Sequence, residues 1–424
     1  MTQTTPKPSL AYLLVHAVGP GLLMAGAAIG VSHLVQSTRA GADYGWTLIS
    51  VVLLINALKY PFFEYGHRYA VATGETLLDG YKQMGGGFLY VFLAMAAFSA
   101  IGSIAGVTIV TAGLAQYFFG TALSATAWSA IVMALCFALI VGGHYKALDG
   151  AMKLIMAVLA AATIVAFGAA IVHGPVAPGF VGPSPWQAAA LPFLVALMGW
   201  MPAPIEISVF QSLWIRARDI ETGRRTTFDE AKFDFNLGYG LTIALAILFV
   251  GLGALGMYGS GLELQNSTGG FANQLIDVYT RMLGGWVGPV IALAAFTTMF
   301  STTLTVIDGY PRALADGLRL VAPGAGTFNR LHAIFIVVIC AAALGVIIAF
   351  VSSLTGLIDL VTTLAFLAAP LYGYLNYRLI TSDHTPAALQ PGMGMRALSW
   401  AGLVFFVGFS LFFLVFRFAP SLLA

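Results

Sequence analysis

The sequence predicts a polytopic, all-α integral membrane protein. Of its 424 residues, 59% are hydrophobic and only 8% are charged, a balance that water-soluble globular chains do not show. The hydrophobic residues fall in long blocks, and about 20 consecutive apolar residues are what a helix needs to cross a bilayer. The blocks lack the ten-residue alternation of membrane β-strands, so the predicted fold class is helical.

Eleven apolar blocks are separated by Gly, Pro and charged residues. The predicted spans cover residues 11–38, 46–71, 87–117, 122–143, 149–173, 186–215, 234–258, 284–312, 329–352, 354–380 and 396–418. The first block is expected to remain as a membrane helix, because it continues as a full span without the small-residue cleavage site of a signal peptide.

The basic residues predict the orientation of the spans. Cytoplasmic loops retain Lys and Arg, and with a cytoplasmic N-terminus fifteen of the basic residues fall on the inner side. Arg39, Arg281 and Arg417 fall outside, and Lys59 is left over within the second span. An odd number of spans then places the C-terminus in the extracellular or periplasmic space. The expected location is the plasma (inner) membrane.

Composition and motifs exclude several other classes of protein. A net charge of +2 is too small to indicate a nucleic-acid partner. Cys136 and Cys340 lie inside apolar segments, so neither a disulfide framework nor a zinc cluster is expected. No phosphate-binding loop with a Lys-Ser/Thr ending occurs, which argues against an ATP-driven pump. No enzyme is predicted, because Ser32 and His33 are helix neighbours that do not face each other and have no orienting acid beside them.

Two spans carry helix-breaking residues at matching places. The first contains GPGLLMAGAAIGVSH (residues 19–33), and the sixth contains LMGWMPAPIEIS (residues 197–208) with Pro202 and Pro204 near its middle. Interrupted backbone at membrane depth is tolerated only where it is buried in protein or lines a cavity. Two breaks five spans apart therefore indicate an inverted repeat with a central substrate site. The single membrane domain, 1–424, would consist of a first repeat (11–173), a second repeat (186–380) and an additional helix (396–418).

The residues around these breaks resemble those of a known family. The run GPGLLMAGAAIGVSHLVQSTRAGADYGW (residues 19–46) is similar to the first helix of the NRAMP (natural resistance-associated macrophage protein) divalent-metal transporters, and MPAPIEIS (residues 201–208) corresponds to the family's Met-Pro-His segment. The resemblance implies a LeuT-like fold of the APC superfamily, with a 5+5 inverted repeat, broken helices 1 and 6 and one extra helix. It further implies a secondary active transporter with alternating access, proton coupling and a divalent metal, such as manganese or iron, as cargo.

The chain departs from the family at the metal-binding positions. Aligned on Gly-Pro-Gly, the family's ligand aspartate falls on Gly30 and its ligand asparagine on His33. The ligand methionine is retained as Met201, whereas the histidine two positions later is Ala203. The third span holds no carboxylate where the family has acidic residues for proton passage. The resemblance thus implies the family scaffold with a degenerate metal motif.

The predicted substrate site combines residues from both breaks: Gly30, Ser32, His33, Met198, Met201, Ala203 and Glu206. His33 and Met201 are the expected metal ligands, because imidazole and thioether groups bind transition metals, and Gly30 and Met198 would add carbonyl oxygens. Glu206 or His33 would carry the coupled proton. Each has a structural alternative, since His33 could be bonded to a neighbouring helix, Met201 could fill the core and Glu206 could pair with another helix.

Two other functions stay open on these residues. Without the aspartate and histidine the pocket is roomier and less acidic, so the same fold could carry a small organic solute whose carboxylate binds at half-helix N-termini. The third alternative is a sensor on a transporter scaffold. In each case the expected partners are the lipid bilayer and a small ion or solute, with no bound cofactor and no obligatory protein partner.

Other charged residues of the spans are expected to form ion pairs. Asp308 is spaced four residues before Arg312, which predicts a helical pair near the cytoplasmic end of the eighth span. Glu64, His67 and Arg68 crowd the end of the second span, where a solvated ion-pair network is expected.

Overall fold

The protein folds as a bundle of helices. The computed structural model describes residues 9–10, 12–13, 17–120, 122–142, 145–262, 265, 267–350 and 352–422, and every regular element in that part is helical. The main helices are α2 (Pro20–Ala28), η1 (Ser32–Ser37), α3 (Thr38–Tyr44), α4 (Ile49–Thr73), α5 (Leu77–Gln83), α6 (Gly86–Phe119), α7 (Ala125–Val141), α8 (Tyr145–His173), α9 (Leu191–Trp200), α10 (Ile207–Thr222), α11 (Phe228–Gly256), α12 (Thr268–Leu283), α13 (Gly288–Val321), α14 (Phe328–Ala349), α15 (Leu354–Ile380) and α16 (Met393–Phe418). Short 3-10 turns add Ala188–Ala190, Gly285–Val287, Ala387–Leu389 and Pro420–Leu422.

Helices lie at each of the eleven predicted positions, and two further helices were not predicted. Six described helices are long and apolar enough to cross a membrane, judged by length and composition: α6, α11, α13, α14, α15 and α16. The first and sixth predicted spans are each split in two, α7 has 17 residues, and α4 carries Lys59, Glu64 and Arg68. The unpredicted helices, α5 and α12, are 7 and 16 residues long and contain charged residues, so an apolar-run criterion does not find them.

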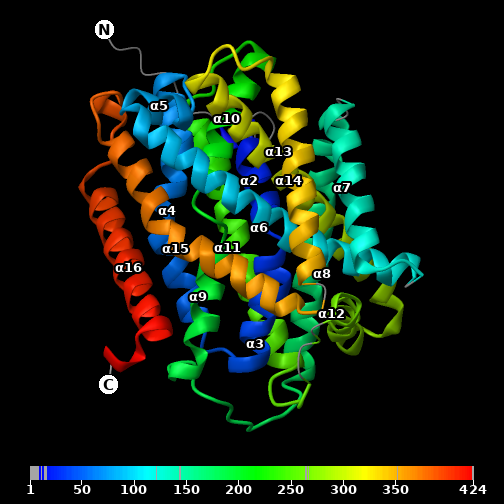
Figure 1. Cartoon of the computed structure of the whole chain (residues 1–424). Coiled ribbons are helices and arrows are strands. Elements are labelled where there is room, and N and C mark those ends of the chain that lie inside the picture. Colours follow the sequence, from blue (N-terminus) through cyan, green and yellow to red (C-terminus); the bar gives the residue numbers. More distant parts are fainter. Residues whose placement is uncertain are drawn as a thin grey trace.

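The broken helices lie inside the bundle and run in opposite directions. Figure 1 shows α2 and α10 in the upper half and α3 and α9 in the lower half. Both α2 and α3 pack against α11, while α10 packs against α4 and α9 against α15. α6 packs against α13, and α16 lies at the edge of the bundle against α15 and α4 (Figure 1).

Glycine sets the closest approaches between these helices. A Cβ at Gly41 of α3 would lie 1.9 Å from the Val250 carbonyl oxygen of α11, and a Cβ at Gly199 of α9 would lie 1.8 Å from the Thr362 carbonyl oxygen of α15. Small residues at helix contacts allow backbones to approach closely in membranes, where van der Waals packing holds helices together. The broken helices are therefore fixed against their neighbours by backbone contact.

One predicted ion pair is confirmed and the other prediction needs correction. Arg312 donates to both carboxylate oxygens of Asp308 at 2.9 and 2.7 Å, as the spacing predicts. Arg68 and Glu64 do pair, but Glu64 is only 1% exposed, so the expectation of a solvated network is wrong. Arg68 is held by sequence-distant groups as well, because it donates to the Leu389 carbonyl and lies over the Phe228 ring.

Candidate functional site

The first break separates α2 from η1 at Ile29 and Gly30, as the glycine-rich motif predicts. The hydroxyl of Thr302, on α13, lies 2.8 Å from the Gly26 carbonyl oxygen and 3.0 Å from that of Ile29. Carbonyls at a helix end have no intrahelical donor, and a buried carbonyl needs a partner. Thr302 thus satisfies the interrupted end of α2 from another helix.

Gly30 makes this contact sterically feasible. A Cβ at residue 30 would lie 2.8 Å from Thr302 Cγ2 and 3.1 Å from its Oγ1. The Gly30 carbonyl, expected to be a ligand donor, instead accepts the amide hydrogens of His33 and Leu34 at 3.1 and 2.9 Å. Gly30 therefore packs against Thr302 in this conformation.

Ser32 and His33 form a buried hydrogen-bonded pair just after the break, so the expectation that these helix neighbours do not face each other is wrong. The Thr242 carbonyl can only accept, so His33 Nε2, at 2.9 Å, donates to it. His33 Nδ1 lies 2.8 Å from Ser32 Oγ, which also lies 2.8 Å from the Ala28 carbonyl oxygen. A neutral ring accepts the Ser32 proton, whereas a protonated ring donates to Ser32 and lets the hydroxyl donate to Ala28. Both protonation states of His33 therefore have paired ring nitrogens.

The second break lies between α9 and α10, at residues 201–206. Pro202 and Pro204 have no N–H, so they cannot continue the hydrogen-bond ladder and leave carbonyls at the end of α9 without helical donors. The Met201–Pro202 peptide bond is cis. Met201 is fully buried. The proline-rich motif therefore predicts this interruption correctly.

Lys59 of α4 supplies the donors that the second break lacks. Its Nζ donates to the carbonyl oxygens of Met198, Gly199 and Ala203 at 2.8, 2.7 and 3.0 Å. The Lys59 side chain is 0% exposed. An ammonium group has three N–H donors, and here each one meets a carbonyl. We call these three oxygens the carbonyl cage.

Glu206 follows the cage at the start of α10 and is 1% exposed. Its Oε1 accepts from the Tyr310 hydroxyl of α13 at 3.1 Å, and that hydroxyl lies 3.1 Å from Ser103 Oγ of α6. Glu206 Oε2 has no hydrogen-bond partner among the described residues.

The two breaks face each other inside the bundle. Ser32 Oγ lies 3.3 Å from the Pro202 carbonyl oxygen, which joins the first break to the second. The described part of the chain contains no group of three or more His, Cys, Asp or Glu that could hold a metal ion. A cation at this place would therefore rely on carbonyls, a thioether and one imidazole.

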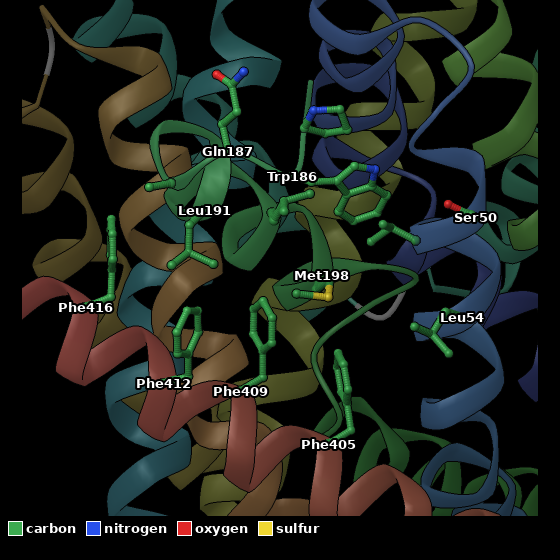
Figure 2. Close-up of a pocket in the computed structure, with 14 residues that line it drawn as sticks. Ser50, Leu54, Trp186, Gln187, Leu191, Met198, Phe405, Phe409, Phe412 and Phe416 are labelled. Carbon is green, nitrogen blue, oxygen red and sulfur yellow. The ribbon is translucent and has the colours of Figure 1, made fainter. Parts of the chain in front are cut away.

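The Met198 side chain leads away from the carbonyl cage. It points into an apolar cavity of about 460 Å³ between α4, α9 and α16, which also contains the aromatic rings of Trp186, Phe405 and Phe409 (Figure 2). Met198 thus contributes its carbonyl and not its sulfur to the cage.

Sequence reasoning missed Lys59 and Thr302 as residues of the breaks. Lys59 did carry a signal, because a charged residue in the middle of a span is costly and usually functional. Thr302 carried none, since threonine is common in membrane helices and its partners are more than 270 residues away.

The chain matches known proteins over nearly its full length. The family model of natural resistance-associated macrophage protein-like proteins matches residues 21–416. The uncharacterised protein PM0681 of Pasteurella multocida strain Pm70 is 36% identical over 402 residues, covering 94% of this chain and 92% of the relative.

Solved structures share the fold at low sequence identity. A mutant of the Eremococcus coleocola manganese transporter superposes with a TM-score of 0.70 at 14% identity, covering 96% of this chain and 87% of that one. MhsT in complex with L-phenylalanine gives 0.66 at 13% identity, covering 96% and 98%. Mhp1, a nucleobase-cation-symport-1 family transporter, gives 0.60 at 15% identity, covering 95% and 94%. These neighbours have the LeuT fold, with which the interrupted helices agree. On the match to its family model, the chain belongs to the natural resistance-associated macrophage protein-like family of membrane transporters.

Proposed function

We propose that the protein carries a divalent metal cation by alternating access, with its site between the two helix breaks. The observation that supports this most is the carbonyl cage, where three backbone oxygens converge within 3.0 Å of a positively charged nitrogen. Unwound backbone carbonyls at half-helix ends are the groups with which this class of fold coordinates cations. The Eremococcus coleocola relative is a manganese transporter, so Mn²⁺ is the cation to test first.

We infer an eleven-span architecture built on a 5+5 inverted repeat. The packing supports it, because α3 lies against α11 and α10 lies against α4. If the repeats are 11–173 and 186–380, these two contacts are equivalent, since each joins the second half of a broken helix to the second helix of the other repeat. The third helices, α6 and α13, pack against each other, as a pseudo-two-fold axis requires.

The cytoplasmic N-terminus and outer C-terminus remain our proposal for the topology. Arg68 reaches Leu389 in the α15–α16 connection, and Arg216 reaches Asp79 of α5, so these basic residues gather near one end of the bundle. Arg39 pairs with Asp359 near the other end of α15. The rule that cytoplasmic loops retain basic residues then assigns the first end to the cytoplasm.

The proposed cargo site keeps the predicted residues. Met201 would offer its sulfur, Met198 and Ala203 their carbonyls, and Ser32 and His33 would line the opposite side with Gly30. Because both His33 nitrogens are engaged, ligation requires the ring to give up its bond to Ser32 or Thr242. Glu206 is the carboxyl best placed to carry the coupled proton, since it is buried beside a break and bonded to Tyr310, and His33 is the alternative.

Uptake of Mn²⁺ into proteoliposomes tests the function. The wild type should take up Mn²⁺ above protein-free vesicles, and Met201→Leu should weaken uptake by about tenfold because the substitution keeps the volume and removes a soft ligand. Met133→Leu is the matched control, since Met133 is buried on α7, outside the proposed site, and it should leave uptake unchanged. Absence of Mn²⁺ flux with uptake of an amino-acid-like solute would support the organic-solute alternative.

A further inference from the structure

We infer that the Lys59 ammonium is the resident cation of the cargo site in the empty transporter, and that a cargo cation must displace it from the carbonyl cage to bind. This inference rests on the proposed function, because it assigns the cage to the cargo.

The oxygens around Lys59 Nζ are arranged as they would be around a bound cation. Three carbonyl oxygens lie 2.7 to 3.0 Å from Nζ, and they come from both sides of the break, two from the end of α9 and one from between the prolines. Lys59 is fully buried, and ordinary burial of a lone ammonium in a membrane helix is strongly unfavourable. The cage therefore replaces the hydration that Lys59 loses.

One acidic residue lies in the same helix break as the cage. Glu206 is at the start of α10, three residues after Ala203, and it is buried. Two buried tyrosines on helices packed against α4 are bonded elsewhere, since Tyr239 of α11 donates to the Asn56 carbonyl, and Tyr81 of α5 donates to Asn376 of α15. The three carbonyl oxygens are therefore the groups that directly stabilise the buried ammonium.

Two cations cannot share the same three oxygens, because like charges at contact distance repel strongly where water is excluded. A metal ion that enters the cage must therefore move the ammonium out of it. After the metal leaves, Lys59 can return, and the empty protein then changes conformation with its carbonyls still paired. Lys59 is thus a residue that sets cargo affinity and allows the return of the empty transporter.

The experiment compares Mn²⁺ binding, Mn²⁺/Mn²⁺ exchange and net Mn²⁺ uptake in the wild type and in Lys59→Gln. Glutamine keeps N–H donors for the cage and removes the charge. We expect Lys59→Gln to bind Mn²⁺ about tenfold more tightly, to exchange Mn²⁺ at about the wild-type rate, and to lose about tenfold in net uptake. Exchange does not need the empty protein to reorient, whereas net uptake does. Lys82→Gln, at an exposed lysine of α5, is the matched control and should change none of the three.

Each outcome separates the inference from the proposed function. If the wild type transports Mn²⁺ but Lys59→Gln binds no more tightly, or loses exchange and uptake equally, the inference is wrong and the function stands. If only Lys59→Gln binds Mn²⁺, Lys59 does occupy the cage, and metal transport by the wild type is wrong. If neither protein binds Mn²⁺, both are overturned. Should Lys59→Gln fail to fold, Mn²⁺ binding is measured in Lys59→Arg instead. This variant keeps the positive charge, so tighter Mn²⁺ binding than in the wild type would overturn the inference.

Discussion

Thr302 and Gly30 are in such close contact that the side chain of one determines what the other can be. A Cβ at residue 30 would lie 2.8 Å from Thr302 Cγ2, and the same threonine holds the carbonyls of Gly26 and Ile29. The position that the sequence resemblance aligns with a ligand aspartate thus holds a glycine in contact with Thr302.

Gly30→Ala should destabilise the protein by overpacking, by about 1–3 kcal/mol, because Thr302 lies on a buried helix and has little room to move. Restoring a carboxylate with Gly30→Asp should cost more. Thermal unfolding in detergent measures both. Thr302→Ser removes Cγ2 and keeps the hydroxyl, so the double variant Gly30→Ala/Thr302→Ser should recover part of the loss. Equal stability of single and double variants would contradict the steric account.

Thr302→Val should cost about 1–3 kcal/mol, because it keeps the shape of the side chain and leaves the carbonyls at the end of α2 without a donor. The same change at Thr297, a half-buried position on α13 whose hydroxyl bonds within its own helix, serves as the control. Thermal unfolding should separate the two variants. A shift of similar size in both would mean that the α2 carbonyls do not depend on Thr302.

The start of α2 depends on Asp234 of α11, which accepts the amide hydrogens of Gly19 and Gly21 at 3.0 and 2.6 Å. A carboxylate at a helix N-terminus satisfies amides that have no helical partner and interacts well with the helix dipole. Asp234→Asn retains only one acceptor oxygen, so the anchor should weaken by about 1.5–3 kcal/mol. Hydrogen exchange of the first turns of α2 should quicken.

Asp229→Asn is the matched control for this anchor, because Asp229 lies on the same helix and is exposed. It should leave exchange in α2 at the wild-type rate. Slow exchange in Asp234→Asn would show that α2 is held by its other contacts.

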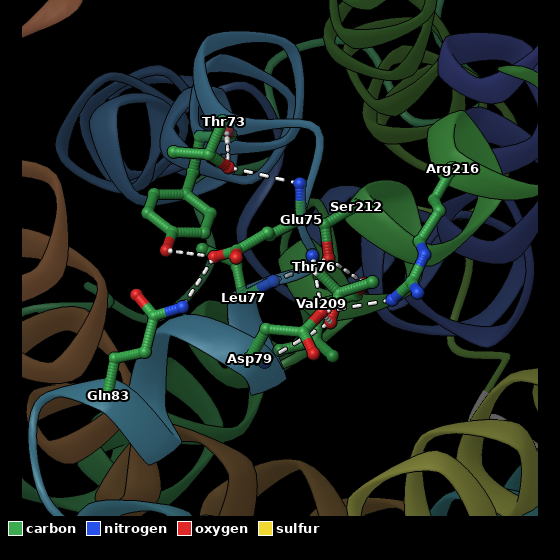
Figure 3. A network of polar contacts seen from close by, with 10 residues as sticks. Thr73, Glu75, Thr76, Leu77, Asp79, Gln83, Val209, Ser212 and Arg216 are labelled. Carbon is green, nitrogen blue, oxygen red and sulfur yellow. Dashed lines mark hydrogen bonds and ion pairs between the residues drawn. The ribbon is translucent and has the colours of Figure 1, made fainter. Parts of the chain in front are cut away.

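The contacts of α5 allow two kinds of polar interaction to be ranked (Figure 3). Thr76 is buried and forms a capping box with Asp79, whose Oδ2 also accepts from the partly exposed Arg216 at 3.0 Å. Thr76→Ala should cost about 1 kcal/mol, because the cap is lost, whereas Arg216→Ala should cost about 0–1 kcal/mol, because water screens the exposed pair. Unfolding midpoints in low and high salt check the order, and only the Arg216 effect should shrink with salt.

The sequence predicted both helix breaks, because glycine and proline act locally on the backbone wherever they occur. It did not predict what fills the breaks. Lys59 lies about 140 positions before the carbonyls that it binds, and nothing in a sequence marks a carbonyl as unpaired.

The burial of Glu64 shows the same limit. The ion pair with Arg68 follows from the helical spacing, but the further partners of Arg68 are the Leu389 carbonyl and the Phe228 ring, more than 150 residues away. The α12 helix was missed for a different reason, since its 16 residues alternate apolar and polar groups and form no apolar run. Local sequence thus predicts where helices form, whereas the burial of a side chain and its hydrogen-bond partners depend on the tertiary fold.

The attachment of Lys59 to α4 has a consequence for ion leakage. α4 packs against α10, the helix that follows the second break. If these helices move as one body in a rocking mechanism, the ammonium and the oxygens around it travel together. In the empty protein the carbonyl oxygens of the cage then stay paired with Lys59, so no unpaired polar site opens to either side of the membrane. Sodium and protons should therefore find no path through it at rest, and the resting membrane potential would be preserved without a separate gate.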